Sequence, residues 1–178
     1  MALKGALLTL AAGVFTLVTG SALADTDSGN FNFFLKGKYR ENASIDCATG
    51  ATSDEIGTSS LPIHVSFTGV VSYDGNGNVT VAEHGIVIGA GQPGTFDENC
   101  IGTYSVNRNG SFSRESKCTA TDNSYTLSGI KWKGQIGEEG MVLSMSQAER
   151  VEQTLVGPGL NIKRICGGVS TQVRIQRP

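Results

Sequence analysis

Acid–base chemistry in this chain could rest on only a few residues. The sequence has two histidines, His64 and His84, and a neutral imidazole can move protons near pH 7. The carboxylates that could orient them are Glu83 and the pair 97–98. Glu83 and His84 are neighbours, however, and neighbouring residues of a strand point to opposite faces. We therefore assign no catalytic residue and expect surface or turn positions for these side chains. His64 and His84 are the first positions to examine if the protein is an enzyme.

Ligand binding could instead rest on aromatic side chains, which recur about once per predicted strand. Such side chains can line a pocket for an apolar or aromatic ligand, but they also simply fill the interior of a small barrel. Both interpretations remain open from the sequence. The residues predicted to bind a ligand are Phe67, Tyr73, Tyr104, Phe112 and Trp132.

Metal binding is not indicated. The run 74–78 reads Asp-Gly-Asn-Gly-Asn and places oxygen-bearing side chains at alternate positions, as a calcium loop does. An EF-hand loop also needs glycine at its sixth position and an acid at its twelfth, where this chain has Val79 and Gly85. A hairpin turn explains the run, because Gly, Asn and Asp tolerate positive φ. No CxxC spacing of the zinc-site kind occurs among the four cysteines. We expect no metal and no cofactor.

Two of the cysteines flank a predicted hairpin. A three-residue loop over 108–110, with Gly110 in the left-handed conformation, would pair Cys100 directly with Cys118. Opposed residues of an antiparallel pair lie about 4.5–5.5 Å apart between Cα atoms, which a disulfide can span. A two-residue turn would instead pair Cys100 with Thr119 and put the two cysteines on opposite faces. We prefer the register that joins the two sulfur atoms.

The N-terminus reads as a secretory signal peptide over residues 1–24. Lys4 supplies the positive charge, 5–18 is nearly unbroken apolar sequence, and 22–24 is Ala-Leu-Ala, which suits a cleavage site. The mature chain would be residues 25–178, a length that fits one domain with one core.

Export agrees with the cysteine count and the charge. An even number of cysteines in an exported chain favours disulfides, so Cys47 would pair with Cys166 if the hairpin pair forms. Without Lys4, 13 basic residues face 16 acidic ones, a net charge of −3, which argues against a nucleic-acid partner. We expect a secreted or periplasmic protein.

Strand-forming patterns with tight turns recur along the whole mature chain. The clearest is 61–73, where Val65, Phe67 and Val71 share one face and polar residues lie largely on the other. The segment 46–60, which carries Cys47, reads as a loop. The other predicted strands are 31–40, 79–88, 101–107, 111–117, 124–133, 141–146, 160–165 and 169–175, with 147–155 ambiguous between strand and helical turn.

Strand 124–133 has one further prediction attached to it. Its inner face would hold Tyr125, Leu127 and Gly129, with Lys131 as a further candidate.

Together, the predicted strands indicate an all-β fold, an antiparallel meander of about eight or nine strands. We expect the meander to close into an eight-stranded barrel, because closure removes exposed edges.

Two strings of the chain resemble a known pattern. The string 66–79 contains the pattern FxGxxxxDGNGNV, and the string 102–111 contains GTYxVNxxG. In this they resemble secreted bacterial barrels of unassigned role, of the calycin-like, allene-oxide-cyclase-like and dirigent type. The resemblance covers roughly residues 30–135 and implies the fold. It implies no catalytic residue, because its motifs are turn motifs.

The function predicted from these features is non-catalytic binding of a small apolar ligand by an exported, disulfide-stabilised barrel. One alternative is a cyclase, isomerase or lyase acting on an apolar substrate inside the barrel. Another is an extracellular structural or adhesion module. No mature segment is apolar enough to span a membrane as a helix, and an outer-membrane barrel is disfavoured because aromatic residues are only 7% of the chain. The sequence leaves the oligomeric state open.

Overall fold

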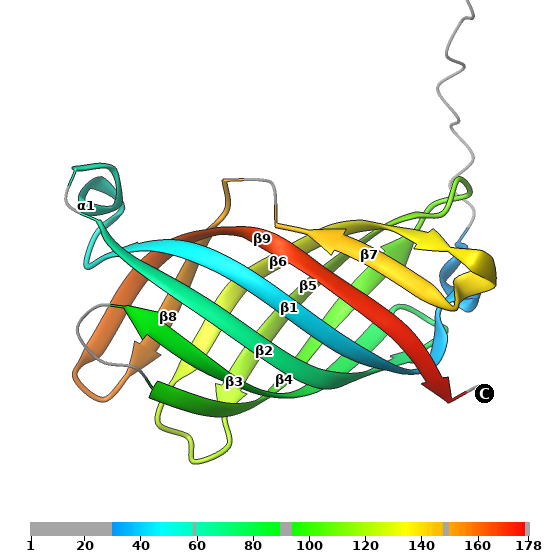
Figure 1. Ribbon diagram of the computed structural model, residues 1–178, viewed down its shortest axis with the longest axis horizontal. Coiled ribbons are helices and arrows are strands. Elements are labelled where there is room, and N and C mark those ends of the chain that lie inside the picture. Colours follow the sequence, from blue (N-terminus) through cyan, green and yellow to red (C-terminus); the bar gives the residue numbers. More distant parts are fainter. Residues whose placement is uncertain (1–29, 59, 90–93, 148–149, 177–178) are drawn as a thin grey trace, which may run out of the picture.

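One antiparallel sheet of nine strands makes up most of the molecule (Figure 1). The computed structural model describes residues 30–58, 60–89, 94–147 and 150–176, so the predicted signal peptide lies outside the described residues. The strands are β1 Lys36–Gly50, β2 Leu61–Asp74, β3 Asn78–Gly89, β4 Gly94–Val106, β5 Ser111–Ala120, β6 Thr126–Gly137, β7 Val142–Ser146, β8 Glu152–Gly157 and β9 Leu160–Gln176. The short helices are η1 Asn32–Phe34, α1 Ser53–Thr58 and η2 Glu138–Gly140. None of the helices in the described part of the chain is long and apolar enough to cross a membrane.

The sheet closes into a barrel because β1 pairs with both β2 and β9. Strands β1 to β6 follow one another as a meander. The short strands β7 and β8 share the remaining position, since each pairs with a different part of β6 on one side and of β9 on the other. Eight positions around the barrel therefore hold nine strands, which confirms the predicted all-β architecture.

Both predicted disulfides are present. Cys100 lies opposite Cys118 in the β4–β5 pair and is bonded to it. The preferred hairpin register is therefore correct, with Gly110 at φ 78° in the connecting turn. Cys47 is bonded to Cys166 between β1 and β9, where the barrel closes.

Four local predictions were wrong. Residues 32–34 form η1, so the first strand begins at Lys36. Cys47 lies inside β1 rather than in a loop, because β1 continues to Gly50 with full pairing to β9. The two predicted closing strands form the single strand β9. Lys131 is exposed, because the β5–β6 register shifts next to Gly129 and reverses the faces that follow.

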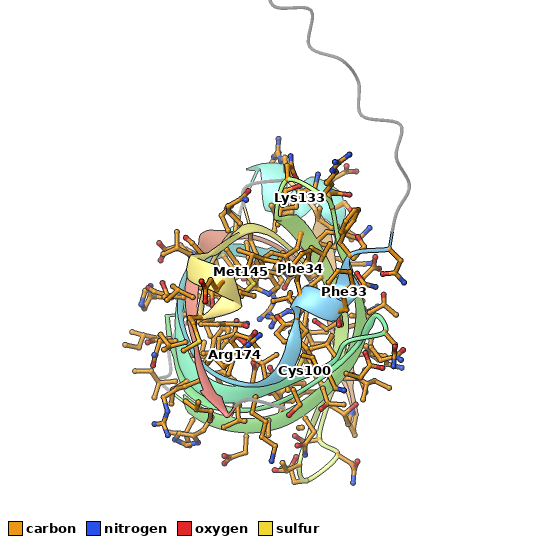
Figure 2. The ribbon with its side chains drawn as sticks, turned by 90° about the vertical axis from the view of Figure 1, so that its right-hand side faces the viewer. Phe33, Phe34, Cys100, Lys133, Met145 and Arg174 are labelled. Carbon is orange, nitrogen blue, oxygen red and sulfur yellow. A yellow bond between two sulfur atoms is a disulfide. The ribbon has the colours of Figure 1, made fainter. Side chains whose placement is uncertain are left out.

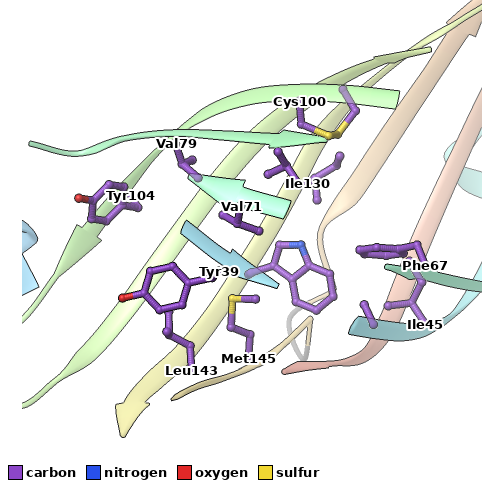
Figure 3. Close-up of a cluster of buried hydrophobic side chains, with 14 of the residues drawn as sticks. Tyr39, Ile45, Phe67, Val71, Val79, Cys100, Tyr104, Ile130, Leu143 and Met145 are labelled. Atoms are coloured by element: carbon purple, nitrogen blue, oxygen red, sulfur yellow. A yellow bond between two sulfur atoms is a disulfide. The ribbon is translucent and has the colours of Figure 1, made fainter. Parts of the chain in front are cut away.

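Side chains fill the barrel at the end where η1 lies, opposite α1 (Figure 1). Figure 2 looks onto this end, where η1 with Phe33 and Phe34 lies over the barrel opening. Tyr39, Tyr73 and Tyr104 pack edge to face, with ring centroids 5.4 and 4.9 Å apart. Leu143 and Met145 are buried beside Tyr39 (Figure 3). This half is thus a packed core of the kind expected in a small barrel.

Candidate functional site

The other half of the barrel holds a cavity of about 210 Å³ that is partly open to solvent, since Gly94 and Thr95 of its lining are exposed. Its wall comes from the strand ends near α1, and Figure 3 shows Phe67 and Ile45 of this region set apart from the tyrosines of the packed half. The volume lies between the ~150 Å³ of an engineered cavity that takes benzene and the ~300–1,000 Å³ of sites for drug-sized ligands. The apolar wall is formed mainly by Ile45, Val65, Phe67, Val81, Leu127 and Ile130.

A buried ion pair lies where the packed half meets the cavity. Glu41 is fully buried on β1, and Arg114 of β5 is 3% exposed and lines the cavity. The guanidinium donates two hydrogen bonds of 3.1 Å to the two oxygens of Glu41, and the Ser170 hydroxyl donates a third at 2.7 Å. Burial opposes the charge of Arg114, but Glu41 and the other acidic groups nearby outweigh it and raise its pKa. Arg114 therefore remains charged, and it also lies 5.7 Å from the ring centroid of Trp132.

Two carboxyl groups lie side by side in the cavity wall, on the neighbouring strands β3 and β4. Glu83 and Glu98 are direct partners in the β3–β4 register, and each offers a carboxylate oxygen within 4.8 Å of the other. Glu98 is 5% exposed, and within the described part of the chain its Oε2 has no hydrogen-bond partner. Burial, followed by the neighbouring Glu98, raises the pKa of Glu83 well above its ordinary value. Glu83 is therefore the member of the pair that holds a proton more readily, and that proton lies beside the Glu98 carboxyl group.

A second arginine reaches the cavity from β9. Arg164 donates a hydrogen bond of 2.7 Å from Nε to Gln153, whose amide donates one of 3.1 Å to Gln147. Burial lowers the pKa of Arg164, while the Glu98 carboxylate opposes this change. Burial and Glu98 also raise the pKa of Tyr125, which keeps this phenol neutral at physiological pH. The polar groups of the cavity thus comprise one carboxyl pair, two cations and neutral donors.

The carboxyl pair lies beside a disulfide, and this limits metal binding. Ligand atoms of Glu83, Glu98, Cys100 and Cys118 all lie within 4.8 Å of one another. The two sulfurs are bonded to each other, however, and zinc binds cysteine as the thiolate. Only two carboxyl groups therefore remain as ligands, and these do not form the four-ligand set of a structural zinc site.

Of the five residues that the sequence predicted as ligand contacts, two line the cavity and three do not. Phe67 and Trp132 line the cavity. Tyr73, Tyr104 and Phe112 are buried in the core but do not line it. Their burial is explained by packing, because the tyrosines stack on one another in the filled half.

Both histidines lie on the outer face of the barrel. His64 Nδ1 is 2.8 Å from an oxygen of Asp46, and His84 Nδ1 is 2.9 Å from an oxygen of Asp97. The two side chains are 42% and 59% exposed. Each is a cross-strand surface pair, and neither histidine lines the cavity.

Glu83 and Glu98 were considered from the sequence only as partners of the histidines and were expected at surface or turn positions; this was wrong, because both line the cavity. Glu41, Arg114 and Arg164 were missed altogether at the level of the sequence.

The signal for Glu83 was present, since it follows Val79 and Val81 at the same period of two and so falls on the inner face. The same alternation carries Arg114 inward from Phe112. A charged residue at an inward position is the feature that would have identified both.

Comparison with known proteins adds little to this description. No protein-family model matches the chain, and neither does any curated protein. The crystal structure of Rv2717c from M. tuberculosis aligns with 81% of this chain and 94% of its own, at a TM-score of 0.29 and 13% identity. The class of protein, a small closed antiparallel barrel with an interior cavity, rests on the strand pairing of the chain itself.

Proposed function

We propose that this protein is an exported barrel that binds a small, mainly apolar ligand in its interior cavity without transforming it. The observation that carries the proposal is the cavity of about 210 Å³, found in a barrel whose other half is closely packed. Protein interiors leave few voids larger than a water molecule. A concave, mainly apolar space with a few convergent polar groups is the usual form of a small-molecule site. The presence of such a space in an otherwise packed barrel favours a ligand.

Export is part of the same proposal. Disulfides persist in oxidising compartments, and this chain has two. Together with the signal-peptide pattern of residues 1–24, they support a secreted or periplasmic protein. The turn motifs support a relation to the calycin-like and dirigent-type barrels.

Native mass spectrometry of the protein purified from its own source tests the proposal. We expect a retained compound that is released on denaturation. A Val81→Phe variant, which places a larger side chain in the cavity, should lose the compound and remain folded. Ile101→Phe is the matched control, because Ile101 is 68% exposed on the neighbouring strand. Absence of any retained compound, with equal binding of benzyl alcohol by both variants, would refute the proposal.

A cyclase, isomerase or lyase remains the second candidate, and the carboxyl pair favours it. A neutral carboxyl beside a carboxylate in an apolar site can serve as general acid and general base. If the protein is an enzyme, the compounds retained by wild type and by Glu83→Gln should differ in chromatographic retention and fragmentation, because only the wild type converts its substrate and an isomerisation leaves the mass unchanged. Identical retained compounds would favour simple binding.

A further inference from the structure

The carboxyl pair leaves one strong acceptor unused. Glu98 is 95% buried, lines the cavity and has no partner for Oε2 among the described residues. An unmet acceptor on a buried carboxylate is unfavourable unless a donor reaches it. The Glu83 carboxyl group and the Tyr125 hydroxyl already interact with Glu98 from the wall. A further donor for Oε2 would reach it from the cavity side, because Glu98 lines that space.

Glu83 supplies a second oxygen at the same place. It faces Glu98 across the β3–β4 pair and lines the cavity as well. Gly69 lies opposite Glu83 on β2, and a Cβ there would come within 3.0 Å of the Glu83 Cβ. It would also come within 2.7 Å of the Ala82 carbonyl oxygen, so the glycine allows β2 to approach β3 closely beside Glu83. A primary ammonium has three donors and could bind both carboxyl groups at once.

The charges around the pair favour a cation over an anion. The groups facing Glu83 are Glu98 of β4, Glu41 of β1, Arg114 of β5, Arg164 of β9 and Tyr125 before β6, as the electrostatic couplings show. Arg114 is neutralised by its ion pair with Glu41.

Arg164 interacts favourably with both Glu98 and Glu83 and so offsets negative charge on the carboxyl pair. An ammonium that displaces the proton held by Glu83 leaves the charge of the cavity unchanged. A carboxylate ligand would add negative charge beside Glu98 and leave its acceptor unmet.

We infer that the cavity is a site for a small apolar amine, whose ammonium group is held between Glu83 and Glu98. The inference rests on the proposed function, since it names the head group of the ligand bound in that cavity. The volume of about 210 Å³ limits the apolar part to one ring or a short branched chain. The aliphatic side chains of Val65, Leu127 and Ile130 would contact that part.

Isothermal titration calorimetry with four probes of similar shape tests the inference: benzylamine, benzyl alcohol, benzoate and toluene. We expect benzylamine to bind at least about tenfold more tightly than the others, because hydrogen bonds to charged groups are the stronger ones. Titrations in buffers of different ionisation enthalpy should show proton release on binding of benzylamine only. Its affinity should therefore rise with pH.

Variants distinguish binding of the ammonium group from binding of the apolar part of the ligand. Glu98→Gln should weaken benzylamine about tenfold or more and leave toluene within about twofold, and toluene binding also shows that the variant is folded. If Glu98→Gln fails to fold, Glu83→Gln takes its place and should abolish the proton release. Glu115→Gln is the matched control, since Glu115 is 59% exposed on the outer face of β5.

The outcomes distinguish the two proposals. If toluene or benzyl alcohol binds as tightly as benzylamine, or benzoate binds best, the amine inference is wrong and the proposed function stands. If none of the four probes binds, both are wrong. Tight binding of benzylamine without proton release would also overturn the inference, because the proton held by Glu83 would then not be displaced.

Discussion

Replacing Glu41 with glutamine should be among the most destabilising single substitutions in this barrel. The carboxylate is fully buried and accepts three hydrogen bonds, two from Arg114 and one from Ser170. Glutamine keeps the shape of the side chain but leaves a guanidinium that is 3% exposed without its counter-charge. Breaking a buried ion pair in this way costs about 3–5 kcal/mol. At about 2–4 °C per kcal/mol for a domain of this size, Tm should fall by about 6–20 °C.

Guanidinium chloride unfolding with intact disulfides measures this loss directly. The double variant Glu41→Leu with Arg114→Met should recover most of the stability, since apolar residues of similar size often replace a buried pair at no cost. Glu115→Gln, on the outer face, should change the free energy of unfolding by less than about 0.5 kcal/mol. A loss below about 1 kcal/mol for Glu41→Gln, or strictly additive single changes in the double variant, would refute the reasoning.

Three further predictions follow from the same interior. Replacing both cysteines of the Cys47–Cys166 bridge with alanine should lower the free energy of unfolding by about 5 kcal/mol, and the same change at Cys100–Cys118 by about 3 kcal/mol. The difference arises because the bridges span 119 and 18 residues of sequence. Equal losses on chemical unfolding would contradict this. Burial raises the pKa of Tyr73 and of Tyr104 to about 12, so ultraviolet titration should show no tyrosinate from these two at about pH 10. The stability that they contribute is complete below their unfolded pKa near 10 and is lost as pH rises towards 12. Glu83→Gln should become more stable relative to wild type as pH rises above the ordinary carboxyl range. The reason is that the raised pKa of Glu83 in the folded state makes its ionisation lower the stability of the wild type there. A relative gain that grows towards acid pH would contradict the prediction.

The fold was largely predictable because its signals are local. Period-two alternation identifies a strand from a few residues. The turn at Gly110 allowed two registers, and the positions of Cys100 and Cys118 selected the one that the structure has. The second disulfide then followed from the even number of cysteines. None of these steps required knowledge of contacts distant in sequence.

The site was only partly predictable because its geometry depends on distant pairings. Glu41 meets Arg114 across the barrel interior, and nothing near either residue in the sequence indicates the partner. Gly129 shows the limit of alternation, since a register shift beside it turned Lys131 outward and Trp132 inward. The aromatic residues identified two cavity contacts, Phe67 and Trp132, but aromatic character alone does not distinguish packing from a binding site.

The ion pair between Glu41 and Arg114 bears on how the sequence of this barrel can evolve. It separates a tightly packed end from a hollow one, so the two ends can respond differently to substitution. Side chains such as Val65, Val81 and Leu127 already border open space, and exchanging them should alter which compound fits at modest cost to folding. Ligand preference could therefore diversify at one end while the other end keeps the protein folded.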